Sequence, residues 1–597
     1  MNIKHLAAIT AAVCMAASLV ACGNEIQKND RLELPPQEDI ITQAEESKPD
    51  NTVAEEQDQP VRSFDEVTIT AKEAKYTKFS KKYNAESGSI SGKAKQADKR
   101  EGYEGKGYVT NITDQSDWEI SFDLPSTQYY NISITVASDE TVQNGIAVNG
   151  TKISEFTVSD SGKFETCTFR NIKLEEGLNK VSIVPENGVL DVDYVEVTAS
   201  EDISKLSFKL KDPALSNKNA EYNAKALYQY ICDNFGSSVI LGQYDTAGTT
   251  YESDLIYRTT GKNPAIRFGD MMQVTAGSDS ADVVKSEIAA AEKWHEDGGI
   301  VAYMWNWIAP TDGKDPESIY AENTDFDISK AVTKEDVAGK SIDELKKLVS
   351  DKKISQECLD VIEDIDAVSE QLAVLRDEGI AVLWRPLQEA SNGYFWWGHD
   401  EDSYKWLWKL MYQRMTNYHQ LNNLVWVWSA QNSGWYVGND QCDVLSVDVY
   451  DDSNGRDGQV NSLLYLQSVC ANKPIAMSEC GSFPDIQSIA DEKAMWSYIG
   501  QWGGNFIVDE EGKLSEEHNT EADLITMYNN NLTVTREKLP DFITLANEIK
   551  QKEEEESKDA KDTKDTKKSD SSSEKSSDSK SSNDKNDKKS ETSEKSE

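Results

Sequence analysis

The sequence predicts a multidomain chain in which a β-sandwich module precedes a (β/α)8 barrel. Short period-two segments fill residues 64–199, and buried apolar strands alternate with helical segments over residues 216–548. A third observation limits the folded part: residues 23–63 and 549–597 are too polar to bury a core. We therefore expect a flexible linker before the sandwich and a disordered tail after the barrel.

The chain begins with a predicted export signal. Lys4 and His5 precede an apolar run from Leu6 to Val20, which is too short to span a membrane comfortably and is typical of a signal peptide. The run closes on Leu19-Val20-Ala21-Cys22-Gly23, which resembles the lipobox of bacterial lipoproteins. The resemblance implies a lipoprotein signal over residues 1–22, lipidation of Cys22, and an extracellular protein anchored to the membrane at the cell surface. An ordinary cleaved signal with an incidental cysteine is the alternative.

The charge and the cysteines argue against two classes of function. The formal net charge is −44, whereas binding to nucleic acid needs basic patches. Apart from Cys14 and Cys22, the cysteines include no Cys-x-x-Cys pair, and no histidine cluster accompanies them. We therefore expect neither a nucleic-acid partner nor a zinc site. Export permits disulfides, but the sequence does not give their pairing.

Residues 64–199 contain short alternating segments separated by turns, at a spacing typical of a β-sandwich. The predicted strands are Val67–Thr70, Trp118–Phe122, Tyr130–Ile134, Gly145–Gly150, Lys180–Val184 and Val192–Val197.

The same residues resemble carbohydrate-binding modules of family 35, which are jelly rolls. The resemblance is carried by Gly107-Tyr108-Val109, Gly150, Gly177-Leu178-Asn179 and Asp191-Val192-Asp193-Tyr194. It implies glycan binding, with a purely structural spacer as the alternative. That family often holds a structural calcium through acids near its first strand and an aspartate in its last.

Asp193 matches the calcium-binding aspartate of the last strand. Lys72, however, stands where one of the first-strand acids is expected, with Glu73 beside it. A structural calcium is therefore an open expectation that Lys72 argues against.

Residues 216–548 alternate between apolar strands and helical patterns such as Val283–Trp294 and Val361–Arg376, which predicts a (β/α)8 barrel. The eight predicted strands are Val239–Leu241, Ala265–Phe268, Ile300–Tyr303, Ile380–Leu383, Leu424–Trp428, Val444–Val447, Pro474–Met477 and Asn505–Val508.

Two of these strands run directly into a glutamate. Trp384-Arg385-Pro386-Leu387-Gln388-Glu389 follows the fourth strand, and Ile475-Ala476-Met477-Ser478-Glu479-Cys480 covers the seventh. Catalytic groups of such barrels lie at the C-terminal ends of strands, and glycoside cleavage uses two carboxyl groups. An aromatic cluster suited to stacking on sugars, Tyr394-Phe395-Trp396-Trp397, follows Glu389. Ordinary carboxylates in surface salt bridges are the alternative.

The region also resembles glycoside hydrolase family 26, whose best-known members are endo-β-1,4-mannanases. The matching segments are Leu241–Tyr244, Met304–Trp307, Leu383–Gly398, Asn417–Trp428, Asp443–Tyr450 and Ser478–Gly481, in the family's order. The resemblance implies a retaining reaction on mannan-type polysaccharide, with Glu389 as acid/base and Glu479 as nucleophile. We expect no cofactor for catalysis, and we expect a monomer.

Further residues are candidates for substrate binding. Tyr450 is expected to donate to the nucleophile, Arg385 to keep a nearby carboxylate ionised, and Trp305 and Trp502 to stack on the sugar. Packing is the alternative for each of these aromatic residues. Tyr394 and Trp397 are expected to line the cleft, and Trp396 beside Trp397 is the other candidate for its wall.

Gln388 and Asn306 stand where family members commonly carry histidine, and Tyr394 stands where tryptophan is usual. Both amides can hydrogen-bond sugar hydroxyls but cannot titrate. The substitutions leave mixed-linkage β-glucan and β-xylan as rival substrates. A non-catalytic glycan-binding lipoprotein and an adhesin are the alternatives from other classes, and the presence of both glutamates argues against them.

Overall fold

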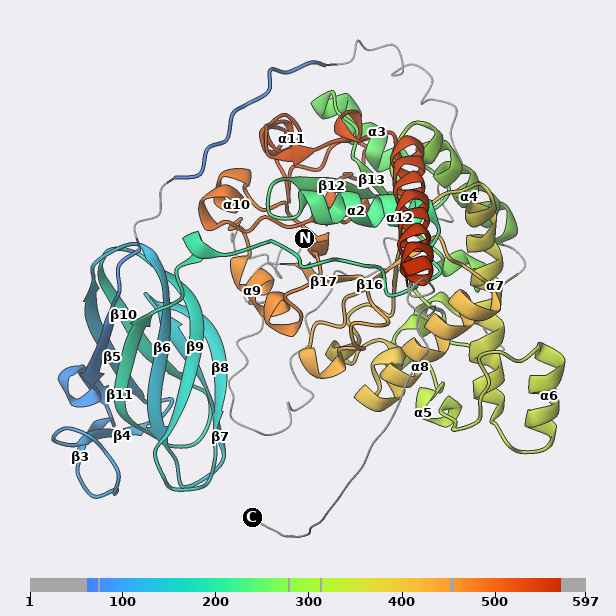
Figure 1. Cartoon of the computed structure of the whole chain (residues 1–597). Helices are drawn as coiled ribbons and strands as arrows, with labels where there is room; N and C mark the ends of the chain where they lie inside the picture. The colour runs from blue at the N-terminus through green and yellow to red at the C-terminus, as the bar shows by residue number, and fades with distance from the viewer. Residues whose placement is uncertain (1–61, 73–75, 278–279, 312–313, 451–455, 571–597) are drawn as a thin grey trace, which may run out of the picture. The chain divides into compact units, whose positions relative to one another are not determined.

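The computed structural model describes residues 62–72, 76–277, 280–311, 314–450 and 456–570. These residues contain a β-sandwich and a parallel barrel surrounded by helices, as the sequence predicts (Figure 1). The predicted signal, the lipidation site Cys22 and the linker up to residue 61 lie outside the described residues.

The sandwich consists of two antiparallel sheets. One sheet has the order β3-β4-β11-β6-β9, with β1 also pairing with β11, and the other has the order β2-β5-β10-β7-β8. The strands are β1 Ser80–Asn84, β2 Ser89–Gly92, β3 Lys95–Ala97, β4 Tyr108–Ile112, β5 Ser116–Leu124, β6 Gln128–Ala137, β7 Val142–Val148, β8 Thr151–Val158, β9 Glu165–Leu174, β10 Gly177–Pro185 and β11 Leu190–Ala199.

Alternation of apolar and polar residues explains why these segments form a sandwich. In β5, Trp118, Ile120, Phe122 and Leu124 are buried while the residues between them are more exposed, so one face of the strand packs in the core. The predicted strands at 118–122, 130–134, 145–150, 180–184 and 192–197 are confirmed, with longer limits or limits shifted by a few residues.

The predicted strand Val67–Thr70 is not part of the sandwich. Val67 instead forms a parallel bridge with Asn530, and the Ile69 N–H donates to Asn531 Oδ1 at 2.6 Å. Ile69 also joins the hydrophobic core of the barrel. An alternating run predicts an extended segment, but it does not say which neighbouring chain will pair with it.

Eight parallel strands form the barrel, and pairing of β12 with both β13 and β19 closes it. Every residue of β14, β15, β16 and β18 is buried, which is the pattern of strands covered on both faces. The strands are β12 Val239–Tyr244, β13 Ile266–Asp270, β14 Ile300–Trp305, β15 Val382–Pro386, β16 Leu424–Trp428, β17 Val444–Val449, β18 Ile475–Cys480 and β19 Tyr498–Gln501; a short strand β20, Thr533–Val534, also pairs with β12.

The eighth strand is not the predicted one. Tyr498–Gln501 pairs with β12 and β18, whereas the predicted segment Asn505–Val508 begins within the short turn Gly504–Phe506. Both segments are short and apolar. Only the one with a buried neighbour on each side can complete the barrel, and the sequence pattern does not reveal those neighbours.

Helices surround the barrel strands, and the predicted helical segments lie within α4 and α7 (Figure 1). Ser355 caps the N-terminus of α7, with its side chain accepting the Cys358 N–H. The helices are α2 Tyr222–Asn234, α3 Tyr251–Thr260, α4 Ala281–Glu296, α5 Ile328–Ala331, α6 Ile342–Ser350, α7 Gln356–Asp377, α8 Glu401–Gln413, α9 Val460–Val469, α10 Ile486–Glu492 and α11 Glu521–Tyr528.

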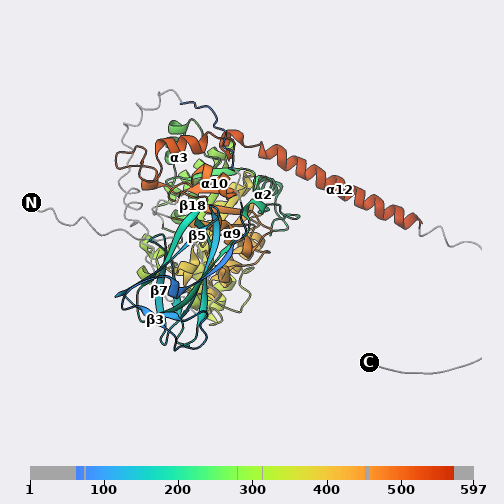
Figure 2. The same cartoon turned by 90° about the vertical axis from the view of Figure 1, so that its left-hand side faces the viewer.

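The polar tail differs from its predicted disorder up to residue 570. Figure 2 shows α12, Phe542–Asp570, as one continuous helix. Its sequence is rich in Glu and Lys, which have high helix propensity, so a composition too polar for a core still permits a helix. None of the described helices has the length and apolar character needed to cross a membrane.

Candidate active site

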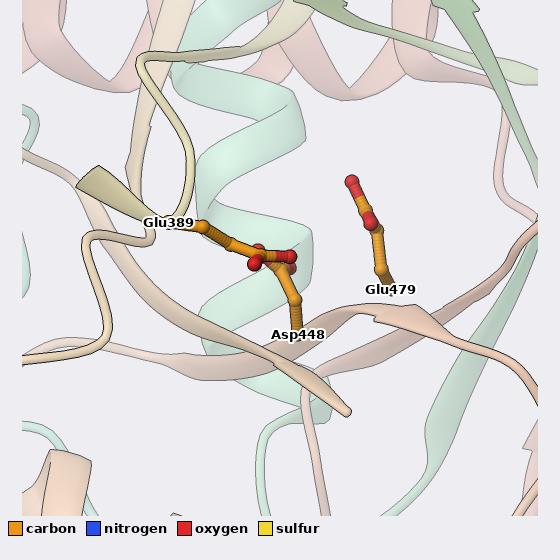
Figure 3. Close-up of side chains that lie close together, drawn as sticks. All are labelled: Glu389, Asp448 and Glu479. Atoms are coloured by element: carbon orange, nitrogen blue, oxygen red, sulfur yellow. The ribbon is translucent and has the colours of Figure 1, made fainter. Parts of the chain in front are cut away.

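The two predicted catalytic glutamates come together at the C-terminal ends of the barrel strands. Glu479 belongs to β18, and Glu389 follows β15. Figure 3 shows the two side chains on separate segments, with the carboxylate of Asp448 from β17 beside that of Glu389. One carboxylate oxygen from each of the three residues lies within 4.8 Å of the others.

Glu389 is held outside the regular strand by an unusual backbone conformation. The strand ends at Pro386, which has no N–H to continue a ladder. Leu387 and Glu389 then adopt φ angles of 55° and 51°, in the left-handed region. The Glu389 N–H donates to Ser429 O at 2.9 Å, which ties this turn to the segment after β16. Glu389 is thus not the strand-end residue that the apolar run predicts, but it still lies at this end of the barrel.

Arg385 lies beneath the carboxylates and pairs with two of them. Its guanidinium donates to Glu479 Oε1, and it lies 3.0 Å from Asp448 Oδ2. It also donates to the Tyr244 hydroxyl at 2.9 Å, and only 2% of its surface is exposed. The expectation that Arg385 supports an ionised carboxylate matches this geometry. As a direct substrate contact it stays a prediction.

The surroundings of the two glutamates favour opposite protonation states. Burial, followed by the negative charge of Asp448, raises the pKa of Glu389 to about 8. Glu479 receives the Arg385 guanidinium on Oε1 and the Tyr450 hydroxyl on Oε2, the latter at 2.6 Å. Positive charge and donated hydrogen bonds stabilise its ionised form. The site therefore combines a neutral acid with an anionic carboxylate.

Asp448 is a residue that sequence reasoning did not single out. Burial raises its pKa to about 6, although Arg385 opposes the shift. Strand alternation gives a signal for it, because Asp448 lies two residues before Tyr450 and therefore on the same side of the chain.

The two amides expected to bind substrate form a directed hydrogen-bond relay. Asp270, at the end of β13, accepts the Asn306 side-chain N–H at 2.8 Å, and Asn306 Oδ1 accepts from Gln388 Nε2 at 2.7 Å. A carboxylate only accepts, so it fixes the orientation of both amides. Gln388 Oε1 is left buried without a partner among the described residues. The relay thus leaves an unused acceptor on Gln388, the residue that precedes Glu389 in the chain.

The aromatic candidates have different positions. Trp502 and Tyr394 keep exposed surface, and Trp502 lies 4.8 Å from the Tyr244 ring. Trp305 has no exposed surface and stacks on Trp307 at 3.9 Å, so it packs in the core, and its stacking on the sugar stays a prediction. Trp397 is also buried.

Trp397 supports the segment that carries Glu389. Its indole donates to Gln388 O at 2.9 Å, and its ring stacks on Phe395. Trp396 beside it is buried as well and donates to Trp307 O at 2.6 Å. Both tryptophans therefore hold the segment in place, and a direct sugar contact by Trp397 stays a prediction.

The three catalytic-site carboxylates are also the only group with metal-donor spacing in the described ranges. Arg385 already supplies the positive charge between two of them. Among the described cysteines of the barrel region, Cys232, Cys358, Cys442, Cys470 and Cys480 are free thiols.

In the sandwich, Asp193 accepts the Glu104 N–H and its pKa is raised to about 6 by burial. Lys72, placed by sequence at a calcium position, pairs instead with Asp491 and lies outside the sandwich strands. The negative charges of Glu104 and Glu86 add to the effect of burial and also raise the pKa of Asp193.

Comparison with known proteins agrees with this architecture. The sequence profile of glycosyl hydrolase family 26 matches residues 216–538, and that of carbohydrate binding module family 35 matches residues 81–200. A mannan endo-1,4-β-mannosidase of Thermothelomyces thermophilus is 31% identical over 470 residues, covering 76% of this chain and 90% of that protein. Mannan endo-1,4-β-mannosidase A of a Piromyces species is 29% identical over 472 residues, covering 77% and 73%. The crystal structure of a ruminal GH26 endo-β-1,4-mannanase has a TM-score of 0.58 at 26% identity, covering 78% of this chain and 99% of that one.

Proposed function

Because this chain belongs to glycosyl hydrolase family 26 and is a glycoside hydrolase, we propose that it is a retaining endo-β-1,4-mannanase acting on mannan-type polysaccharides. The observation that carries the proposal is the distance between the carboxylate oxygens of Glu389 and Glu479, which is within 4.8 Å. Retaining glycosidases hold these groups about 5–5.5 Å apart, whereas inverting ones need about 6.5–9.5 Å to admit a water. The names of the two relatives support mannan as the substrate.

The first step forms a glycosyl-enzyme. Glu479 attacks the anomeric carbon as the glycosidic C–O bond breaks, and Glu389 gives its proton to the departing oxygen. Burial and the charge of Asp448 keep Glu389 protonated until that moment. Arg385 and Tyr450 hold Glu479 ionised and oriented for attack.

The second step releases the sugar with its original configuration. A water attacks the same carbon, Glu389 takes the water's proton, and the ester bond to Glu479 breaks. The leaving chain has by then vacated the space beside Glu389, so one residue serves both steps. Two inversions at one carbon leave the product in the β configuration.

Product analysis of the full chain tests the proposal. We expect mannose oligosaccharides from mannan and glucomannan, with the β-anomer appearing first in the NMR spectrum. Glu479→Ala should reduce turnover by several orders of magnitude, while Glu537→Ala, at the far end of the barrel strands, should not. Products from mixed-linkage glucan or xylan alone would show that the enzyme acts on one of these rival substrates and not on mannan. Near-normal activity of Glu479→Ala would remove that residue as nucleophile.

The sandwich is proposed to bind the same polysaccharide. A binding module joined to a catalytic domain raises the local substrate concentration without new contacts at the active site. Full-length Glu479→Ala should be retarded in an affinity gel containing mannan, and deletion of residues 76–199 should abolish the retardation. Equal migration of both proteins would leave the module as a spacer.

We also propose a monomer that is anchored at the cell surface through a lipid on Cys22. Cys22→Ala should release the protein from the membrane fraction and block incorporation of labelled fatty acid. Light scattering of the released protein should give the mass of one chain.

Calcium in the sandwich stays a prediction that a chelator can test. Removal of calcium should lower the unfolding temperature of the module if the ion is structural, and it should leave hydrolysis intact because no step above uses a metal.

A further inference from the structure

Asn392 makes a hydrogen bond to the acid/base that the proposed mechanism does not use. Its Nδ2 donates to Glu389 Oε2 at 2.9 Å and to the Tyr394 hydroxyl oxygen at 3.0 Å. Asn392 closes the short turn η8, Ala390–Asn392, which directly follows Glu389. The side chain is exposed, so its position beside a buried carboxyl is not a consequence of core packing.

The backbone of this turn is fixed on several sides. The Asn392 N–H donates to Glu389 O at 3.0 Å, and the Ser391 N–H donates to Ala430 O at 3.2 Å. A side chain at Gly398 would meet Ala390 O at 2.3 Å, so the turn packs closely against the aromatic segment behind it. The amide of Asn392 is therefore carried by a rigid support.

The amide NH2 group of Asn392 faces Glu389. It can donate to Oε2 both when Glu389 is ionised and when Glu389 carries its proton on Oε1. Tyr394 accepts the second amide hydrogen through its hydroxyl oxygen. A tryptophan at position 394 would offer only a donor and could not fill this role. Tyr394 thereby receives a function that the sequence did not suggest.

We propose that Asn392 is a positioning residue that reserves Oε2 of Glu389 as an acceptor and leaves Oε1 to carry the catalytic proton. The inference rests on the proposed function. In the first step, the Oε1–H bond breaks and its proton goes to the departing glycosidic oxygen. In the second step, Oε1 takes a proton from the attacking water. Oε2 keeps its bond to Asn392 in both protonation states, so the carboxyl does not need to turn between the steps.

Leaving-group dependence tests this role. Cleavage of a manno-oligosaccharide needs proton donation to a poor leaving group. The dinitrophenolate of a dinitrophenyl β-mannobioside departs without a donated proton. For Asn392→Ala we expect kcat/KM to fall about 10- to 100-fold on the oligosaccharide and less than about threefold on the dinitrophenyl substrate. Equal losses on both substrates would assign Asn392 to the structure of the turn and overturn the proposal.

A pH profile gives an independent readout. The Asn392 hydrogen bond lowers the pKa of Glu389, against the larger effects of burial and Asp448. Its loss should move the alkaline limb of kcat/KM for the oligosaccharide to higher pH, and an unchanged limb would contradict the proposal. Tyr394→Phe should cause a smaller loss with the same leaving-group dependence. Asn263 lies before β13, and its side-chain amide donates to Glu537 at 3.0 Å, so it provides the matched control. Asn263→Ala should leave kcat/KM unchanged on both substrates.

Glu389→Ala separates failure of the inference from failure of the proposed function. If Glu389 is the acid/base, kcat/KM of this variant falls far more on the oligosaccharide than on the dinitrophenyl substrate. Equal losses in Glu389→Ala would refute the proposed function itself. Selective loss in Glu389→Ala but not in Asn392→Ala would refute only the positioning role.

Discussion

Replacement of Asp448 by asparagine should move the alkaline limb of activity to lower pH. The Asp448 charge lies within 4.8 Å of Glu389 and raises its pKa. At that separation, two unit charges interact by about 3.5 kcal/mol at an effective dielectric constant of about 20, equivalent to about 2.5 pKa units. Arg385 pairs with Asp448 and cancels part of this interaction. We therefore expect the pKa of Glu389 to fall by about one to two units.

The assay is kcat/KM against pH, whose alkaline limb reports loss of the proton from the acid in the free enzyme. Removal of a neighbouring negative charge makes Glu389 more acidic, so activity should decline at lower pH than in the wild type. Asp443→Asn is the matched control, because Asp443 is buried just before β17, at the opposite end of that strand. A limb in Asp448→Asn that stays within about 0.3 units of the wild type would refute the electrostatic assignment.

Three further outcomes follow from individual contacts. Tyr450→Phe removes a hydrogen bond to the ionised Glu479, so kcat/KM should fall about 10- to 100-fold with an unchanged unfolding temperature; a loss below about threefold would contradict that role. Trp307→Ala removes the ring on which Trp305 stacks and leaves a cavity, so the free energy of unfolding in urea should drop by about 3–5 kcal/mol. A loss under about 1 kcal/mol would show that neighbouring side chains move in to fill the cavity. Arg414 and His419 lower the pKa of Asp366, against the effect of burial. Ionised Asp366 therefore stabilises the fold at pH values above its unfolded pKa of about 3.9, and this stabilisation is lost as pH falls through the lower folded pKa. Asp366→Asn should therefore lower the unfolding temperature at neutral pH, with a difference that shrinks in strong acid; an equal difference at both pH values would contradict the ionic origin.

The sequence predicted the barrel well because its strands are buried on both faces. Continuous apolar runs such as Leu424–Trp428 are distinctive, and the structure reproduces that strand without change. The eighth strand was misplaced because Asn505–Val508 is the more apolar of two short segments, whereas Tyr498–Gln501 contains a glycine and a glutamine. Val67–Thr70 was misplaced for a related reason: its partner is Asn530, far away in the sequence.

The sequence motifs predicted that Glu389 and Glu479 lie together at one end of the barrel, but not the contacts that distinguish the two glutamates. Glu389 and Glu479 follow recognisable strand-end sequences, whereas the influence of Asp448 depends on a distance that only the folded barrel creates. The difference between Trp305 and Trp502 is also invisible in sequence, since both are tryptophans near strand ends. One stacks in the core and the other keeps exposed surface.

The backbone of Glu389 has a consequence for how this protein can change over time. A non-glycine residue in the left-handed region costs about 1–2 kcal/mol, and a buried carboxyl adds a desolvation penalty. Glycine at position 389 would remove both costs, so drift under selection for stability alone leads away from glutamate. A lineage that ceased to use the activity would become more stable by losing this side chain. The glutamate at position 389 therefore lowers the stability of the fold, and the reason for its presence lies in the site rather than in packing.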